Sequence, residues 1–265
     1  MSTSTRDPVA AKSPAETPLY TPLDVARYLH LPIGGVLALT GRFRDWPPPE
    51  WFFHRFPWGF PHPFAQDDVL VFSHHHSEQE RFTFRRFADV FVRAAAIQTL
   101  VELGKAGERS MDRWENLCRG IWRGLEDNWH APDLFEVATV EERLERAIAP
   151  FARLDDEALA MLRKWLALRL ERVTLEHGLP ARLHPFSRDP AEASPRLIVL
   201  DPRIHFGRPT ISDRGVPTDI LFERHQAGDS ITELGEDYSL PAGEIEEAIR
   251  YEAQRPVPLC PFFGW

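Results

Sequence analysis

Apolar residues recur at helical spacing through the middle of the chain. Phe84, Phe87 and Phe91 fall on one helical face, and Thr83 precedes them as a helix-capping residue. This spacing predicts a long helix from Phe84 to about Lys105. Further helices are expected from about Met111 to Glu126 and from Glu141 to His177, and Leu154–Glu176 within the latter is a candidate dimer helix. The pattern therefore favours a mainly helical chain of the α+β class.

The last third of the chain alternates short apolar runs with turn residues. Leu197–Leu200 is an apolar run stopped by Asp201-Pro202, which we interpret as a turn, and the glycines and prolines that follow favour a short β-hairpin. Three short helices are expected after it. Ser230 and Glu233 have capping-box spacing for the second helix, and Pro241 opens the third.

The order of the turn residues in this region is specific. The matching features are Asp201, Pro202, Ile204, Gly207, Pro209 and Ile211, the G-V-P-T turn at Gly215–Thr218, the break at Ala227–Ser230 and the final E-E-A-I-R-Y-E-A helix. Through them, Leu197–Gln254 resembles the small helical domain known as domain-of-unknown-function family 433. The resemblance implies a VapB-type antitoxin. Such antitoxins are usually encoded beside a toxin with a PIN-like nuclease fold, and they often carry a helix-turn-helix of the MerR kind at the N-terminus.

The second and third of these helices are joined at Ser239–Pro241 with helix-turn-helix spacing, a frame that ordinarily contacts DNA. Charge argues against that use, because residues 191–265 hold thirteen acidic and seven basic side chains, a net charge of −6, which a phosphate backbone repels. We therefore expect a protein-contacting module with its glutamates outside; an acidic solvated surface without a partner is the alternative. The residues expected in the domain core or at a dimer contact are Ile231, Leu234, Ile245 and Ile249, together with Ala248.

The stretch Tyr20–Gly41 has the pattern of a second helix-turn-helix, and these two pieces are the only internal repeat that we find. Thr21 can cap a helix that starts at Pro22, and Asp24 stands at the capping-box position. A tight turn at His30–Pro32 then precedes a short helix, Ile33–Leu39. The pattern Y-T-x-x-D-V-A-R-Y-L resembles the helix-turn-helix of MerR-type regulators, which implies a winged domain whose second helix enters the major groove of DNA.

This second helix is poor in groups that read bases. Gly34 and Gly35 weaken it by about 1 kcal/mol each relative to alanine, and Ile33 and Val36 occupy positions where polar side chains usually meet base edges. DNA binding is therefore expected to rest on phosphate contacts, and a docked helical pair without DNA is the alternative. The candidate DNA-binding residues are Arg27, Arg42, Arg44 and Arg55.

Two segments combine aromatic residues and prolines at a density that excludes a continuous helix. Trp46–Phe64 holds eight aromatic residues and six prolines in nineteen positions. It is expected to form an irregular belt on the chain's own helices or, alternatively, an arm around a second subunit. The tail Pro256–Trp265 is expected to run extended, either in a partner's groove or on the chain's own core. Its candidate partner-binding residues are Phe262, Phe263 and Trp265.

Composition narrows the function classes. A net charge of −9 over 265 residues excludes a generally basic nucleic-acid coat, so DNA contact needs a local patch such as Glu80–Arg123, with nine basic and six acidic residues. Cys118 and Cys260 are the only cysteines, which suits a reducing cytoplasm. No signal peptide and no apolar run long enough to span a bilayer are found, so neither secretion nor a membrane partner is expected.

The sequence offers no arrangement of catalytic residues. It contains no P-loop, no dinucleotide-binding glycine pattern, no G-x-S-x-G elbow and no H-E-x-x-H helix, so neither an enzyme nor a cofactor is expected. A wing strand is expected at Val69–Phe72. The run His74-His75-His76 follows it in a polar loop, but adjacent histidines do not provide tetrahedral metal geometry, and no metal site is expected there.

These observations predict five parts in the chain. They are a mobile N-terminus (1–17), a MerR-like winged helix-turn-helix region with its following helices (18–130), a helical middle and linker (131–190), an antitoxin-like three-helix domain (191–255) and the tail (256–265). The expected function is the antitoxin of a type II toxin-antitoxin pair, which binds its operator DNA as a homodimer and neutralises a PIN-like ribonuclease toxin. A stand-alone transcriptional regulator and a protein-binding scaffold are the alternatives.

Overall fold

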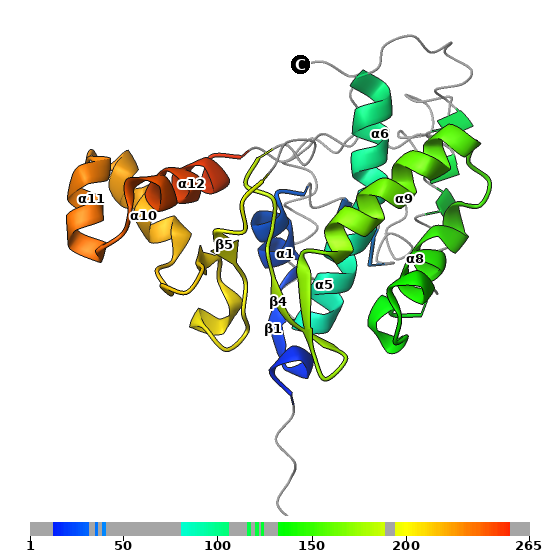
Figure 1. Cartoon of the computed structure of the whole chain (residues 1–265), viewed down its shortest axis with the longest axis horizontal. Coiled ribbons are helices and arrows are strands. Elements are labelled where there is room, and N and C mark those ends of the chain that lie inside the picture. Colours follow the sequence, from blue (N-terminus) through cyan, green and yellow to red (C-terminus); the bar gives the residue numbers. More distant parts are fainter. Residues whose placement is uncertain are drawn as a thin grey trace, which may run out of the picture.

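The fold is known from a computed structural model of the chain. It describes residues 13–31, 35, 36, 39, 40, 81–105, 116, 117, 120, 121, 123, 124, 132–188 and 194–254. Within these ranges the protein is mainly helical with short antiparallel strand pairs, as the apolar pattern predicts. Figure 1 shows two parts side by side: a larger helical body and, to its left, a smaller unit formed by the last third of the chain.

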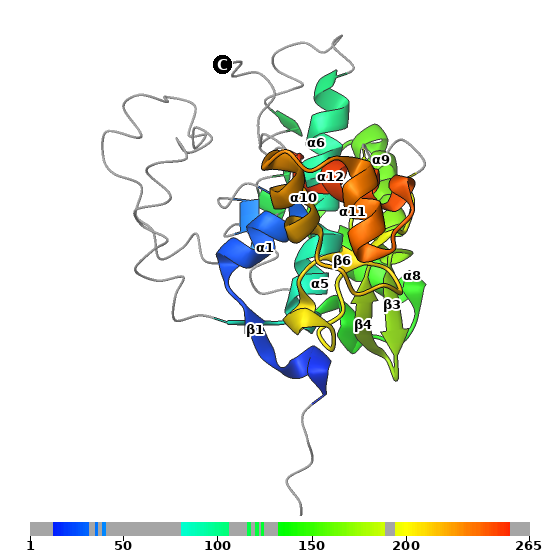
Figure 2. The same ribbon diagram turned by 90° about the vertical axis from the view of Figure 1, so that its left-hand side faces the viewer.

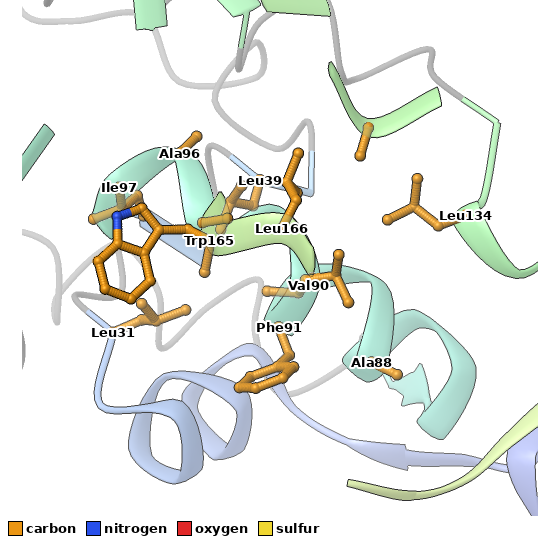
Figure 3. Packing of buried hydrophobic residues seen from close by; sticks show 14 of the residues in the cluster. Leu31, Leu39, Ala88, Val90, Phe91, Ala96, Ile97, Leu134, Trp165 and Leu166 are labelled. Carbon is orange, nitrogen blue, oxygen red and sulfur yellow. The ribbon is translucent and has the colours of Figure 1, made fainter. Parts of the chain in front are cut away.

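The larger body is built around four helices, α5 (Phe84–Arg93), α6 (Ala95–Lys105), α8 (Val140–Ile148) and α9 (Asp156–Leu170). Helix α9 packs against the other three. Trp165 and Leu166 of α9 lie near Phe91 of α5 and Ile97 of α6 in one apolar cluster (Figure 3). Each of these side chains is at most 2% exposed, so the cluster excludes water and holds the helices in place.

Helix α5 begins where the sequence predicts. The amide of Arg86 donates to Thr83 Oγ1 at 3.1 Å, which confirms the expected cap. The helix predicted from Phe84 to Lys105 is divided into α5 and α6 at Ala94. Helical hydrogen bonds continue across this division. The amide of Ala94 donates to the carbonyl of Val90, and the carbonyl of Ala94 accepts from the amide of Gln98.

The helix predicted to continue to His177 ends at Leu170, and this part of the prediction is wrong. Strands β3 (Val173–Glu176) and β4 (Leu179–Leu183) follow as an antiparallel hairpin. The turn between them places His177 at φ 53° and Gly178 at φ 81°, the two positive angles that a two-residue hairpin turn requires. The candidate dimer helix Leu154–Glu176 is therefore a helix only from Asp156 to Leu170.

The N-terminal strand β1 (Pro18–Tyr20) pairs with β2 (Phe82–Thr83), which directly precedes α5 in the sequence. Before it, the 3-10 turn η1 (Pro14–Glu16) packs on α5 and β4, and Ala15 is buried. Residues 13–17, which belong to the segment expected to be mobile, are thus packed. Helix α1 (Pro22–Leu29) follows β1 directly. Two further 3-10 turns, η4 (Leu134–Glu136) and η5 (Ala149–Phe151), flank α8.

The smaller unit confirms the predicted hairpin and three helices. Strands β5 (Ile198–Val199) and β6 (Thr210–Ile211) pair around the 3-10 turn η6 (His205–Gly207), and α10 (Thr218–Gln226), α11 (Ile231–Tyr238) and α12 (Ala242–Glu252) follow. This unit has a separate apolar cluster that includes Leu221, Leu234, Ile245 and Tyr251. Leu183 and Leu200 exchange backbone hydrogen bonds of 3.0 and 2.9 Å, so β4 connects the two parts.

Several predicted features lie outside the described residues. They are the Trp46–Phe64 belt, the wing strand Val69–Phe72, the run His74–His76 and the tail Pro256–Trp265. Of the helix predicted from Met111 to Glu126, the described residues are helical, and Leu117 and Ile121 are buried. None of the helices in the described ranges is long and apolar enough to cross a bilayer.

Candidate functional site

Helix α1 and its exit turn are fixed by local hydrogen bonds. The amide of Asp24 donates to Thr21 Oγ1 at 3.1 Å, and the Asp24 carboxylate accepts from the Thr21 amide at 2.7 Å, which confirms the capping box. The helix ends at His30 in the left-handed conformation, φ 48°. The amide of Leu31 then donates back to the carbonyl of Ala26, and the Leu31 side chain is buried.

The connection between helices α11 and α12 has the same kind of cap and turn as helix α1. Ser230 and Glu233 form a capping box, and α11 ends at Ser239 with φ 53°. The amide of Leu240 donates to the carbonyl of Gly235 at 3.1 Å, and its side chain is buried. We call the two pieces the N-terminal frame (Thr21–Val36) and the C-terminal frame (Ser230–Glu252).

The two frames correspond residue by residue. Thr21 matches Ser230, Asp24 matches Glu233, His30 matches Ser239 and Leu31 matches Leu240, at equal spacing along the chain. The apolar positions correspond as well, because Val25 and Leu234, and likewise Val36 and Ile245, are all fully buried. A capped helix with a left-handed exit turn and a buried leucine after it therefore occurs twice in the part of the chain that the structure describes.

The frames differ in charge at their outer surfaces. Arg27 of α1 has a side chain that is 57% exposed, and the corresponding position of α11 holds the exposed Glu236. The other exposed acidic residues of the C-terminal frame are Glu233, Asp237 and Glu246. A phosphate backbone is attracted to the first surface and repelled by the second.

Direct contacts connect the N-terminal frame to the smaller unit, and Figure 2 shows α1 beside α10 and α12. Asp219, at the start of α10, accepts hydrogen bonds from Arg208 and, at 3.5 Å, from Arg27. The hydroxyl of Tyr251 donates to the carbonyl of Tyr28 at 2.5 Å. Arg27 keeps most of its side chain in solvent despite this long pair, so it stays available to an external anion.

Burial changes the ionisation of the groups in this contact. Burial and then the positive charge of Arg27 lower the pKa of His30 to about 4, so its ring is neutral at pH 7. The ring of His30 meets that of Tyr251 edge to face, with centroids 4.6 Å apart. Burial also raises the pKa of the Glu252 carboxyl, against the hydrogen bond that Thr218 donates to it.

One glutamate of α12 is buried, contrary to the expectation that all of them point outward. Glu247 is 1% exposed, and its carboxylate accepts hydrogen bonds from Arg188 at 2.7 Å, from Ser187 and from Arg250. Burial alone would raise the pKa of this carboxyl, but the hydrogen bonds of Arg188 and Ser187 and the nearby arginine charges hold it below its ordinary value. This cluster fixes α12 to the segment that follows β4.

Asp201 forms the expected turn at the opening of the smaller unit. Its carboxylate accepts from the backbone amide of Arg203 at 2.9 Å, from the Arg203 side chain and from Arg182 of β4. Burial would raise the pKa of Asp201, but these arginine hydrogen bonds hold it below its ordinary value. Arg203 continues to Glu176 at 2.8 Å, which ties the turn to the β3–β4 hairpin.

The arginines of α5 do not form the expected phosphate-binding patch. Arg93 is 1% exposed and pairs with the buried Asp89 at 3.0 Å, and Arg86 pairs with the same carboxylate. Arg85 pairs with Asp133 at 2.9 Å. These guanidinium groups are neutralised within the body by Asp89 of the same helix and by Asp133, which lies outside the counted stretch.

The other predicted site residues are placed as follows. Leu234 and Ile245 are fully buried in the core of the smaller unit, and Ile231 and Ile249 are half-buried against it. Arg42, Arg44, Arg55, Phe262, Phe263 and Trp265 lie outside the described residues. Within the described ranges, no group of three or more His, Cys, Asp or Glu side chains is arranged to hold a metal ion.

Three contacting residues were missed by the sequence reasoning: Asp219, Glu247 and Gly207. Gly207 has φ 75°, and a Cβ atom there would fall 1.7 Å from the hydroxyl oxygen of Tyr20. Asp219 follows Pro217-Thr218, a pattern that indicates a helix start, but nothing local indicates its arginine partners. All three contacts join segments far apart in the sequence, where periodicity carries no signal.

Comparison with known proteins agrees with this division of the chain. A family model described as a protein of unknown function (DUF433) matches residues 198–251, which is the smaller unit from β5 to α12. No curated protein matches the chain. Among solved structures, the chain is similar to the crystal structure of Rv2018 from Mycobacterium tuberculosis. The two share 17% sequence identity with a TM-score of 0.46, over 88% of this chain and 98% of that one.

Proposed function

We propose that this protein is a DNA-binding regulator of the antitoxin type. In this proposal the N-terminal frame contacts operator DNA, the smaller unit binds a PIN-like ribonuclease toxin, and the protein acts as a homodimer. The observation that carries the proposal is the pair of matched frames with opposite outer charge. The same capped first helix presents an exposed arginine in one frame and an exposed glutamate in the other.

The N-terminal frame has the features that phosphate binding needs. The capping box fixes the start of α1 and the left-handed His30 fixes its exit turn, so α1 is held in place by the protein itself. Arg27 is mostly in solvent, and its one ion pair within the described ranges, to Asp219, is 3.5 Å long. A phosphate oxygen can compete with a pair of that length, and each such contact releases counterions from DNA.

The C-terminal frame suits a protein partner with a basic surface. Its exposed Glu236 and Glu246 carry no ion pair within the described chain, so they leave an acidic surface on α11 and α12. A ribonuclease must hold a polyanionic substrate and therefore presents basic groups around its active site. Complementary charge of this kind speeds association and selects the partner.

The DNA-binding part is tested by footprinting with the purified full chain and the DNA upstream of its own gene. We expect a protected site at low salt, with an affinity that falls steeply as salt rises because the contacts are to phosphates. Sedimentation of the free and bound protein gives the stoichiometry, and two chains per site are expected. Absence of a protected site at low salt would overturn this part of the proposal.

The antitoxin part is tested by co-expression with the neighbouring open reading frame. We expect that frame alone to stop growth and the full chain to restore it. A chain without Pro256–Trp265 should fold and bind DNA but fail to restore growth if the aromatic tail lies in the toxin. A neighbouring frame that does not harm cells would instead favour a stand-alone regulator.

A further inference from the structure

A small cavity lies where the turn after α1, the α5–α6 junction, α9 and the end of the smaller unit meet. Its volume is about 60 Å³. The side chains that matter for its chemistry are His30, Gln98, Arg169, Phe186, Arg188 and Gln254. Among the described residues that line it there is no aspartate or glutamate, and the lining combines two arginines and a histidine with two glutamines and apolar groups.

Arg169 of α9 is a buried cation at this cavity. Its residue is 7% exposed, and within the described chain no carboxylate lies at ion-pair distance from its guanidinium. Nη1 donates to the carbonyl of Phe91 at 3.0 Å, and the group lies over the rings of Phe91 and Phe186 at 4.9 and 5.4 Å. A buried guanidinium that has no counter-charge among the described residues is costly, so this position favours an anion.

Two buried nitrogen atoms at the cavity are also without a hydrogen-bond partner in the described chain. They are Nε of Arg169 and Nε2 of His30. Buried donors are nearly always paired, either with the protein or with a bound molecule. Burial lowers the pKa of Arg169 to about 9, in the direction expected for a cation that lacks a negative partner.

We propose that this cavity binds one small oxyanion of the size of inorganic phosphate, held by Arg169 and His30. The volume of the cavity sets the size of the ligand. One water molecule needs roughly 10–15 Å³ of cavity volume. A cavity of about 60 Å³ therefore accepts a group with about four oxygen atoms. The guanidinium of Arg169 provides the charge and fixed donor directions, and a neutral imidazole can add one N–H.

Such an anion would bridge the N-terminal frame to the body and to the smaller unit. His30 is the left-handed residue that ends α1, and Gln254 follows α12 and donates to the carbonyl of Phe186 at 3.2 Å. An oxyanion in the cavity is therefore expected to stabilise the whole junction. This inference does not depend on DNA or on a toxin and goes beyond the proposed function.

The test is a thermal melt of the full chain in phosphate and in chloride at equal ionic strength. We expect phosphate to raise the melting temperature in a saturable manner, because it binds only the folded state. Arg169→Met should fold, since an apolar side chain of similar length suits this buried position, and its affinity for phosphate should fall by about tenfold to a hundredfold. Arg163→Met, on the exposed side of the same helix, is the matched control and should respond as the parent does.

A second measurement does not depend on the variants. Titration of the ¹⁵N-arginine-labelled parent with phosphate should shift one buried Nε resonance, and Arg169→Lys should lack that resonance. Acetate, which has only two oxygen atoms, should give a weaker response than phosphate. A phosphate response that persists in Arg169→Met, or no response of the parent beyond that to chloride, would overturn the proposal.

Discussion

The N-terminal and C-terminal frames of this protein have the same cap and the same exit turn on their first helices, but they differ in the residues that surround them. Thr21 and Ser230 cap the first helices, and His30 and Ser239 end them in the left-handed conformation. The outer surfaces then diverge, with Arg27 in one frame where the other has Glu236. Caps and turn residues therefore determine the geometry of a frame, whereas exposed charge determines which partner it can accept.

The frames also differ in the cores that support them. Val25, Leu31 and Val36 of the N-terminal frame belong to the large cluster that contains Phe91 and Trp165. Figure 3 shows Leu31 with Phe91 and Trp165 in this cluster. Leu234, Leu240 and Ile245 of the C-terminal frame belong to the small cluster of the last third of the chain. The same turn is thus held by a large core in one place and by a small core in the other.

The largest effect is expected when the matched core positions are broken. Ile245→Asp buries an unpaired charge and should destabilise the smaller unit by at least about 4 kcal/mol, while the main body keeps its own transition. Val36→Asp should instead unfold the main body. Circular dichroism melts with limited proteolysis distinguish these outcomes, and Thr232→Asp, at an exposed position of α11, should leave the melt unchanged. Loss of the whole fold in Ile245→Asp would show that the two cores are not separate.

A smaller loss is expected at the contact between the two parts. Gly207→Ala should lower the free energy of unfolding by about 3 kcal/mol, because the added Cβ meets Tyr20 and the backbone has positive φ. Gly228→Ala is the control, since its φ is 115° and no atom lies within 4 Å of the added carbon. It should cost about 1 kcal/mol. Equal losses in urea denaturation would contradict the close approach of Gly207 to Tyr20.

The buried carboxylate of α12 gives a pH-dependent prediction. The pKa of Glu247 is lower in the folded protein than its ordinary value, so its contribution to stability is present above pH 4.3 or so and is lost as pH falls through the folded pKa. Glu247→Gln should remove about 2 kcal/mol at pH 7 and should reduce the acid sensitivity of unfolding. Glu246→Gln is the exposed neighbour and should change neither. An unaltered pH profile in Glu247→Gln would contradict the assignment.

Local structure could be predicted from the sequence because its determinants are local. The caps at Thr21, Thr83 and Ser230, the turn at Asp201 and the three helices of the smaller unit follow from neighbouring residues. The β3–β4 hairpin departs from the predicted helix because its apolar residues also fit a continuing helix, whereas His177-Gly178 forms the hairpin turn. At this point the two positive φ angles of the turn, and not the spacing of the apolar residues, determine the structure.

Long-range contacts could not be predicted in this way. The burial of Glu247 depends on Arg188, and the neutralisation of Arg85 depends on Asp133, and neither pair has a local signature. Of the arginines between Glu80 and Arg123, the three on α5 (Arg85, Arg86 and Arg93) are therefore used for internal ion pairs. Net charge along a sequence predicts an outer surface only where the three-dimensional partners of the charges are known.

The smallest expected effect comes from changing the charge that distinguishes the two frames, and it gives the most direct test of the proposal. We compare binding of the upstream DNA by the parent, by Arg27→Ala and by Glu236→Ala over a series of salt concentrations. Arg27→Ala should weaken binding severalfold and reduce the slope of log affinity against log salt by about 0.9, the value for one lost phosphate contact. Glu236→Ala should bind as the parent does. Equal effects of the two substitutions, or an unchanged slope in Arg27→Ala, would contradict the assignment of DNA to the N-terminal frame.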